Sequence, residues 1–149
     1  YSEAIRLRIV PNSNSSLDRD VKSSVEQNIQ KELLKVININ DSKEIVRTKL
    51  KNNLDNFDTL VKNTFLEKKY YQNYNINYGM NYFPEKEFNN TKIPAGEYES
   101  LVITLGEGKG DNWWCFLFPP LCLLEAQEEN TDKVEYDFYF SKLINKIFK

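Results

Sequence analysis

The chain has 149 residues, with 20 Lys and Arg against 22 Asp and Glu, and a formal net charge of −2. Hydrophobic residues make up 40% and aromatic residues 13% of the chain, which excludes a disordered tail and is enough to build the core of one domain. The small negative charge argues against a protein that binds nucleic acid or an anionic membrane, because such proteins carry an excess of basic residues.

The lack of histidine and the scarcity of cysteine exclude several kinds of catalytic and metal site. Without histidine there can be no Ser-His-Asp or Cys-His nucleophile and no HExxH zinc site. The 2 cysteines are too few for an all-cysteine zinc site. Catalysis by carboxylate, Lys or Tyr side chains remains open. We expect neither a metal ion nor any other cofactor.

The chain begins Tyr1-Ser2-Glu3, without an initiator Met and without the basic and apolar regions of a signal peptide. We therefore expect either a mature chain, left after cleavage of an export segment, or a chain trimmed at its N-terminus. No run of residues approaches the roughly 18 apolar residues that a membrane span requires.

The first half of the chain predicts one strand and two amphipathic helices. Residues 5–9 alternate between apolar and polar, which is the pattern of a strand with one buried face. Residues 11–15 have turn composition and end it. Apolar residues at helical spacing then predict a helix from about residue 16 to residue 36 and a second from about residue 42 to residue 69. The short linker between them favours an antiparallel helical hairpin.

The second half of the chain predicts several strands. Residues 74–82 alternate Tyr, Ile and Met with Asn and Gly, which predicts a strand that ends near Pro84. Residues 93–96 predict a turn, and residues 101–105 predict a short apolar strand. Residues 113–118 are apolar at every position, which fits a central strand or a strand covered by a partner.

The last part of the chain predicts an acidic loop over residues 125–132 and a C-terminal helix from about Val134, although residues 136–140 also fit a strand. Together these elements predict an α+β fold, with a small, mostly antiparallel sheet of about four strands packed on the helical hairpin. No internal repeat and no long linker divides the chain, so we expect a single domain over residues 1–149.

The glycines at positions 106, 108 and 110 suggest a phosphate-binding loop at first sight. Their spacing is not that of a P-loop, and the apolar run that follows is not the helix that a dinucleotide-binding fingerprint opens. We interpret the segment as a connection between two strands, in which glycine adopts backbone conformations that other residues avoid.

Four carboxylates lie in the same part of the sequence, namely Glu97, Glu99, Glu107 and Asp111. Two of them could act as the acid and base of a glycosidase. In a chain with 22 acidic residues, solvated charges on strand edges and loops are the simpler interpretation.

Cys115 and Cys122 lie on either side of a short segment that contains Pro119-Pro120. They can form a disulfide if the chain reverses at the prolines and the compartment is oxidising. The alternative is a pair of reduced, buried side chains. A reactive thiol is disfavoured because no neighbouring cation would stabilise the thiolate.

The densest aromatic signal is the segment Asp111-Asn112-Trp113-Trp114-Cys115-Phe116-Leu117-Phe118-Pro119-Pro120. In a strand, Trp113 lies on one face and Trp114, Phe116 and Phe118 lie on the other. We expect the wholly aromatic face to pack in the core and Trp113, beside the polar start of the segment, to contact a partner. The alternative is a central strand with both faces in the core.

Arg6 and Arg8 lie on the polar side of the first predicted strand. Such a positive stripe could meet an acidic partner. A solvated face, or pairing with neighbouring carboxylates, is the simpler interpretation.

Residues 106–122, which read GEGKGDNWWCFLFPPLC, closely resemble the signature of the stage II sporulation protein R family. Residues 93–99 and 5–15 also resemble this family, and the likeness continues into the first predicted helix. The sequence departs from the family's pattern at Pro11, where the family usually carries Ala, and at Asn14, where it usually carries Asp. The second departure puts an acidic role for position 14 in question.

This resemblance implies a function that residue spacing alone does not. Members of the family are signalling proteins made in the forespore of endospore-forming bacteria and exported into the space between the two sporulation membranes. There they activate a membrane-embedded aspartic protease of the mother cell, which processes a sigma-factor precursor. The resemblance thus implies an activator, not an enzyme, with that protease as its partner. Two other classes stay open: a cell-envelope enzyme that acts on glycan through acidic residues, and a scaffold or adhesion module.

Overall fold

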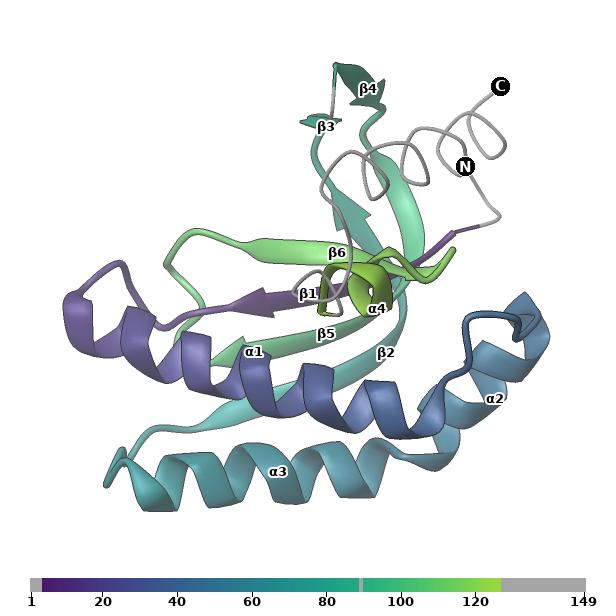
Figure 1. Ribbon diagram of the computed structural model, residues 1–149. Helices are drawn as coiled ribbons and strands as arrows, with labels where there is room; N and C mark the ends of the chain where they lie inside the picture. Colours follow the sequence, from purple (N-terminus) through teal and green to yellow (C-terminus); the bar gives the residue numbers. More distant parts are fainter. Residues whose placement is uncertain (1–3, 89, 127–149) are drawn as a thin grey trace.

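A four-stranded sheet with helices on one face forms the body of the protein, as the computed structural model shows for residues 4–88 and 90–126 (Figure 1). The elements in chain order are β1 (Ile5–Val10), α1 (Ser16–Val36), α2 (Lys43–Asn52), α3 (Leu54–Glu67), β2 (Tyr74–Phe83), β3 (Lys86–Phe88), β4 (Thr91–Ile93), β5 (Gly96–Leu105), β6 (Trp113–Phe118) and α4 (Leu121–Ala126). The predicted α+β class is confirmed. The helix predicted from Val134, the alternative strand over residues 136–140 and most of the predicted acidic loop lie outside the described residues.

The strands are ordered β2-β5-β1-β6. β2 pairs antiparallel with β5, and β6 pairs antiparallel with β1, whereas β1 and β5 are parallel. The parallel pair follows from the route of the chain, which crosses one face of the sheet as helices between β1 and β5. β2 and β5 continue beyond the other strands as a twisted ribbon that leads to the small β3–β4 hairpin (Figure 1).

Side-chain caps and one break define the helices. Ser15 accepts a hydrogen bond from the backbone N–H of Asp18 at the start of α1, and Ser42 accepts one from Ile45 at the start of α2. The prediction of a single second helix is wrong at Asn53, which separates α2 from α3. Its backbone N–H and its side-chain Nδ2 both donate to the carbonyl of Lys49, and such local bonds of Asn compete with continuation of a helix.

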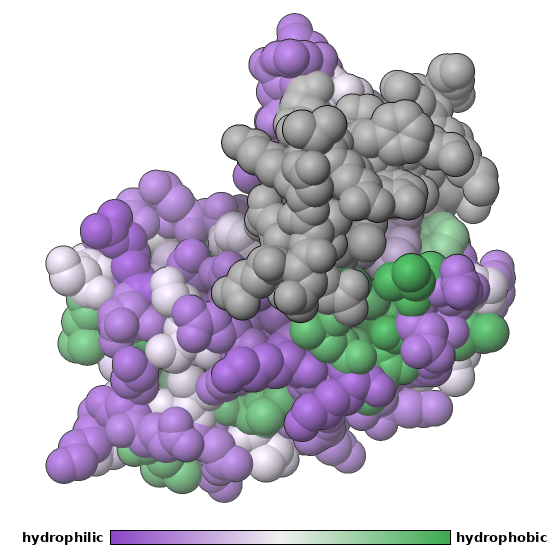
Figure 2. All heavy atoms as spheres, in the orientation of Figure 1, coloured by the Kyte–Doolittle hydropathy of each residue, from purple (hydrophilic) through white to green (hydrophobic). Residues whose placement is uncertain are grey.

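The main core lies between the helices and the sheet. It contains the apolar side chains of one face of each strand and of the inner faces of α1, α2 and α3, among them Ile5, Leu7, Ile9, Val25, Ile29, Leu50, Phe57, Val61, Leu101 and Ile103. The outer faces of α1 and α3 are mainly hydrophilic (Figure 2). This alternation of buried and exposed positions explains why the helical periodicity could be read from the sequence.

Three features of the second half differ from the predictions. The first is α4, which no pattern predicted and which covers the start of the acidic loop expected from residue 125. β5 begins at Gly96 instead of Leu101, because Glu97 and Glu99 already pair with Tyr82 and Met80 of β2. The β3–β4 hairpin was not predicted, because its strands are only 3 residues long and carry charged side chains.

Candidate functional site

β6 is an edge strand whose two faces are both covered. Cys115 and Leu117 belong to the main core beneath the helices, whereas Trp114 and Phe116 belong to a second cluster on the opposite face. This second cluster also contains Ala4, Phe83, Ile93, Tyr98 and Leu121. The strand is therefore neither central nor open on one side, and the aromatic segment contributes to two cores.

The predicted positions of the aromatic side chains need correction at two places. Trp114 is 7% exposed, as expected for a core residue. Trp113 is half-buried and packs against the main core, because it lies on the face that the helices cover. Phe118 also packs against the main core and not beside Phe116, since the ladder between β1 and β6 shifts register next to Ile5 and changes the face that Phe118 presents.

Arg6 contradicts the expectation of a solvated or carboxylate-paired stripe, because it is 0% exposed. Its guanidinium carbon lies 3.6 Å from the ring centroid of Tyr98 and 4.4 Å from that of Trp114. The rings of Phe83 and Phe116 follow at 4.8 Å and 5.4 Å. The polar side of β1 is buried here because the second cluster covers this end of the sheet.

Two further cations surround the same rings. Arg8 is half-buried, lies 4.4 Å from the Phe83 centroid and donates from Nη1 to the carbonyl oxygen of Tyr82 at 2.8 Å. The Nζ atom of Lys86 lies 5.2 Å from the ring of Trp114. We call Arg6, Arg8, Phe83, Lys86, Tyr98, Trp114 and Phe116 the arginine–aromatic cluster. It brings together Arg6 and Arg8 with Trp114 and Phe116, which the sequence had suggested as two separate surfaces.

Burial changes the electrostatics of the cluster. It lowers the pKa of Arg6 to about 10 and also lowers the pKa values of Arg8 and Lys86. These groups stay protonated at neutral pH. The Nε, Nη1 and Nη2 atoms of Arg6 and the Nε atom of Arg8 are buried without a hydrogen-bond partner. Cation–π contacts stabilise the charges, but they leave these N–H groups unbonded.

The backbone N–H groups of the glycine-rich segment all form hydrogen bonds within the protein. Every backbone N–H of residues 106–111 donates a hydrogen bond within the chain. The acceptors, in order, are the Asn73 carbonyl, Asn12 Oδ1, the Leu105 carbonyl, the Asn12 carbonyl, the Pro11 carbonyl and Asn14 Oδ1. None of these N–H groups is left to bind phosphate, so the interpretation as a strand connection, here between β5 and β6, is confirmed.

The glycines follow from the topology of the sheet. β1 and β5 are parallel, so their C-terminal ends lie at the same end of the sheet. Because β1 lies between β5 and β6, the connection from β5 to β6 must pass the point where the chain leaves β1. Gly106 and Gly108 adopt φ values of 58° and 63°. A Cβ atom at Gly106 would overlap the side chain of Asn12, and one at Gly110 would lie 2.6 Å from Pro11 Cγ.

Asp18 stabilises the loop after β1, which contacts the glycine-rich segment. The sequence patterns did not reveal this role. Its carboxylate accepts hydrogen bonds from Ser13 Oγ at 2.5 Å, Asn12 Nδ2 at 2.8 Å and the Tyr70 hydroxyl at 2.5 Å. The bond from Ser13 is the main reason why the pKa of Asp18 lies below its ordinary value. At position 14 the amide oxygen of Asn accepts a hydrogen bond from Asp111, and an Asp would offer the same acceptor.

The four carboxylates considered for glycoside hydrolysis have different environments. Glu99 accepts two hydrogen bonds from Arg47, at 2.7 Å and 2.8 Å, and one from the Tyr78 hydroxyl. The Arg47 bonds are the main cause that lowers the pKa of Glu99, which is the opposite of what a general acid requires. Glu107 pairs with Lys109 at 3.0 Å on the surface, and Asp111 is exposed.

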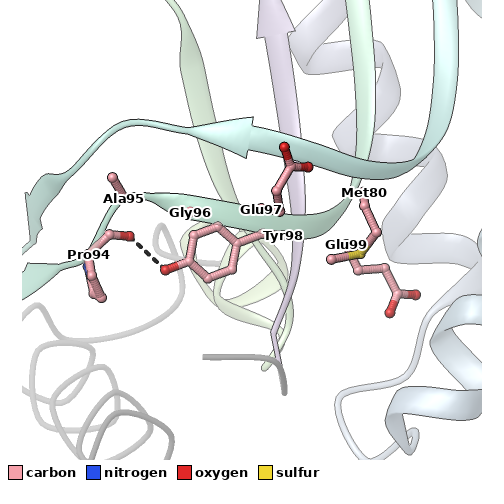
Figure 3. A pocket seen from close by; sticks show the side chains of 7 residues that line it. All are labelled: Met80, Pro94, Ala95, Gly96, Glu97, Tyr98 and Glu99. Atoms are coloured by element: carbon pink, nitrogen blue, oxygen red, sulfur yellow. Dashed lines mark hydrogen bonds between the residues drawn. The ribbon is translucent and has the colours of Figure 1, made fainter.

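Glu97 and Glu99 line a cavity of about 380 Å³ together with Met80, Pro94, Ala95, Gly96 and Tyr98. Figure 3 shows their carboxylates pointing away from each other, and the Tyr98 hydroxyl donating to the Pro94 carbonyl at 2.6 Å. The arrangement does not resemble two carboxylates that converge on one glycosidic bond.

Cys115 and Cys122 form a disulfide that joins β6 to α4, with Cα atoms 5.6 Å apart. Between them the chain turns at Pro119 and Pro120, where the Leu121 N–H donates to the Pro119 carbonyl. The Phe118–Pro119 peptide bond is cis. Leu121 and Cys122 enter the second cluster and the main core, respectively, so α4 is anchored to both.

None of the helices in the described ranges combines the length and the hydrophobicity needed to cross a bilayer. Within the same ranges, no three Asp, Glu or Cys side chains gather into a group that could hold a metal ion.

Comparison with known proteins identifies the family. No solved structure matches the chain. The sequence model of the family described as Stage II sporulation protein R matches residues 1–128. The chain is 38% identical over 136 residues to the Stage II sporulation protein R of Bacillus subtilis (strain 168), and this match covers 88% of the chain but only 61% of that protein. The resemblance noted in residues 106–122 is thus confirmed, and the chain belongs to the stage II sporulation protein R family.

Proposed function

We propose that this protein is a sporulation signal exported from the forespore into the space between the forespore and mother-cell membranes. There it binds and activates a membrane-embedded aspartic protease, which then processes a sigma-factor precursor. Membership of the stage II sporulation protein R family supports a role in sporulation. The finer steps rest on the likeness of residues 5–15, 93–99 and 106–122 to that family.

One structural observation supports a binding role for these residues. The first family-like segment is far from the other two in the sequence, yet it contributes β1, which lies between β5 and β6 in the sheet. Arg6, Tyr98, Trp114 and Phe116, one or two from each segment, meet in the arginine–aromatic cluster. The family-like residues therefore build one buried cluster, which can support the accessible residues around it.

The proposed partner surface has accessible and supporting members. Asp111 and Asn112 are exposed, and the half-buried residues are Arg8, Trp113, Phe118 and Pro120. We assign contact with the protease to these six. Arg6, Trp114, Phe116 and Pro119 are buried and hold the accessible residues in place. The domain would activate the protease by binding its active form more tightly than its inactive form.

Co-expression with the protease and its precursor substrate, with cleavage of the precursor as the readout, tests this function. Trp113→Ala should leave the domain folded and should reduce cleavage sharply, as the loss of an interface anchor does. Tyr71→Ala is the matched control, because Tyr71 is 83% exposed and lies outside the proposed surface. Absence of cleavage with the wild-type protein would refute the activator role and favour a scaffold module. Normal cleavage with a folded Trp113→Ala variant would show that Trp113 does not contact the protease.

A further inference from the structure

Arg6 and Arg8 give the arginine–aromatic cluster its positive charge. Within residues 4–88 and 90–126, no carboxylate pairs with either guanidinium. Elsewhere in this part of the chain, cations such as Arg47, Lys49 and Lys68 are paired with carboxylates. Arg6 is 0% exposed, and its three side-chain nitrogen atoms have no hydrogen-bond partner. Buried polar groups in proteins are almost always hydrogen-bonded, so in the described part of the chain the charge of Arg6 is exceptional: only the surrounding rings stabilise it.

Arg8 is the accessible member of the pair. Arg6 and Arg8 lie on the same face of β1, and their guanidinium carbons lie 4.8 Å and 4.4 Å from the Phe83 centroid. Arg8 is half-buried and uses Nη1 for the Tyr82 carbonyl, whereas its Nε is buried, so a ligand would approach the guanidinium from its Nη side. The buried charge of Arg6 raises the positive potential beside Arg8, because aromatic surroundings screen a charge much less than water does.

The geometry of the two arginines favours one class of ligand. A guanidinium presents its N–H groups as a planar fork, which matches the two oxygens of a carboxylate. A nucleic acid is disfavoured, since its backbone requires an extended basic surface and the chain has a net charge of −2. The rings around the cations also suit a protein segment with apolar residues beside the acidic one.

On the basis of the proposed function, we propose that the arginine–aromatic cluster is a binding site for an Asp or Glu side chain of the partner protease. The carboxylate bonds to Arg8 at the surface, and the charge of Arg6 beneath strengthens the interaction. Lys86, next to Trp114, lies at the margin of the same site.

Charge-removing variants of the whole protein test this site in the co-expression assay. Arg8→Gln should raise the amount of protein needed for half-maximal precursor cleavage by at least about tenfold, as the loss of a charged pair across an interface does. Arg8→Lys should fall between wild type and Arg8→Gln, because lysine keeps the charge and loses the fork. Arg19→Gln is the matched control: Arg19 is exposed on α1, and removing it changes the net charge equally.

A titration without the protease provides an independent readout. Nitrogen-15 NMR would follow the Arg Nε–Hε signals while the peptide acetyl-Ala-Glu-Ala-amide is added, with the Gln peptide as control. We expect the signals of Arg8 and Arg6 to shift with the Glu peptide but not with the Gln peptide.

The two assays separate failure of the site from failure of the proposed function. If the wild-type protein fails to trigger cleavage, the proposed function is wrong, and the titration still tests whether the cluster binds a carboxylate. A second outcome would refute the site alone: the wild-type protein triggers cleavage, Arg8→Gln and Arg19→Gln give the same half-maximal amount, and the Arg8 signal does not shift with the Glu peptide. The proposed binding site is then wrong, and the proposed function stands. Should Arg8→Gln fail to fold, the titration of the wild-type protein decides.

Discussion

Trp113 and Trp114 are adjacent in the chain but pack in different cores. Trp114 makes edge-to-face contacts with Phe83 and Phe116, whereas Trp113 lies at the margin of the main core. We expect Trp114→Ala to lower the free energy of unfolding by about 3–5 kcal/mol. Trp113→Ala should cost less, about 1–2 kcal/mol, because its ring is only half-buried. Urea unfolding followed by far-UV circular dichroism measures both, and a larger loss for Trp113→Ala would contradict the assignment of faces.

Asp18 predicts a pH dependence of stability. Its hydrogen bonds hold the pKa of the carboxyl in the folded protein below the ordinary value. The unfolded chain therefore takes up this proton at a higher pH than the folded one. The stabilisation is fully present above the ordinary Asp pKa of about 3.9 and is lost as pH falls toward the lowered value.

Asp18→Asn should remove this part of the acid sensitivity. We expect the difference in unfolding free energy between wild type and Asp18→Asn to shrink as pH falls from about 6 to about 3. Urea unfolding at several pH values measures it. Comparison with the variant is needed because the pKa values of Asp41 and Glu99 are also lowered and contribute to the acid sensitivity of both proteins. A difference that stays constant over this pH range would show that Asp18 does not act through its charge.

At the scale of elements, the glycine-rich connection between β5 and β6 depends on the loop after β1. Gly106→Ala would put a side chain at a positive φ and into Asn12, so it should cost at least about 1–2 kcal/mol of stability. Gly79→Ala is the control, because a Cβ there would meet only Asn77 Oδ1, at an ordinary 3.7 Å. Thermal unfolding of the two variants separates them. Equal melting temperatures would show that the loop has room to adapt.

The link between β6 and α4 gives a second prediction at this scale. We expect Cys115 and Cys122 to be bridged in the proposed exported form of the protein, as in the structure. The loop is short, so the entropic model gives only roughly 2.5 kcal/mol of stabilisation. The bond therefore fixes the corner at Pro119 and Pro120 more than it holds the fold. Intact-mass measurement after alkylation without reductant decides this, and two alkylated thiols would contradict it.

Periodicity was sufficient to predict the elements whose faces differ in polarity. The alternation in residues 5–9 and 74–82 and the helical spacing in residues 16–36 locate β1, β2 and α1 closely. The break at Asn53 and the hairpin at residues 86–93 were missed, because each depends on local hydrogen bonds or short pairings that leave no hydrophobic pattern.

The candidate site was predictable only in part, because it depends on contacts between distant segments. The aromatic run of β6 was identified, but a polar residue in an alternating strand is normally taken as solvated. The burial of Arg6 follows from the central position of β1 and from the rings of Phe83 and Tyr98, which lie far away in the sequence. The bonds from residues 106–111 to Asn12 and Asn14 are non-local in the same way.

At the scale of the whole molecule, β1 separates two environments. Ile5, Leu7 and Ile9 point to the main core under the helices, while Arg6 and Arg8 point to the arginine–aromatic cluster. The helices and the arginine–aromatic cluster thus lie on opposite faces of one sheet. A partner can bind at the cluster without displacing the main core, so binding there needs no large rearrangement of the protein.

The molecule as a whole is expected to have no hydrolase activity of its own. Glu99 is held ionised by Arg47, and Glu97, the other carboxylate at the 380 Å³ cavity, points away from it. A general acid needs a raised pKa and a second carboxylate that faces the same bond. The purified protein should therefore cleave neither peptidoglycan nor the sigma-factor precursor when the protease is absent. Turnover of either substrate that Glu97→Gln abolishes, and that the surface variant Glu107→Gln leaves intact, would overturn the activator role and establish an enzyme instead.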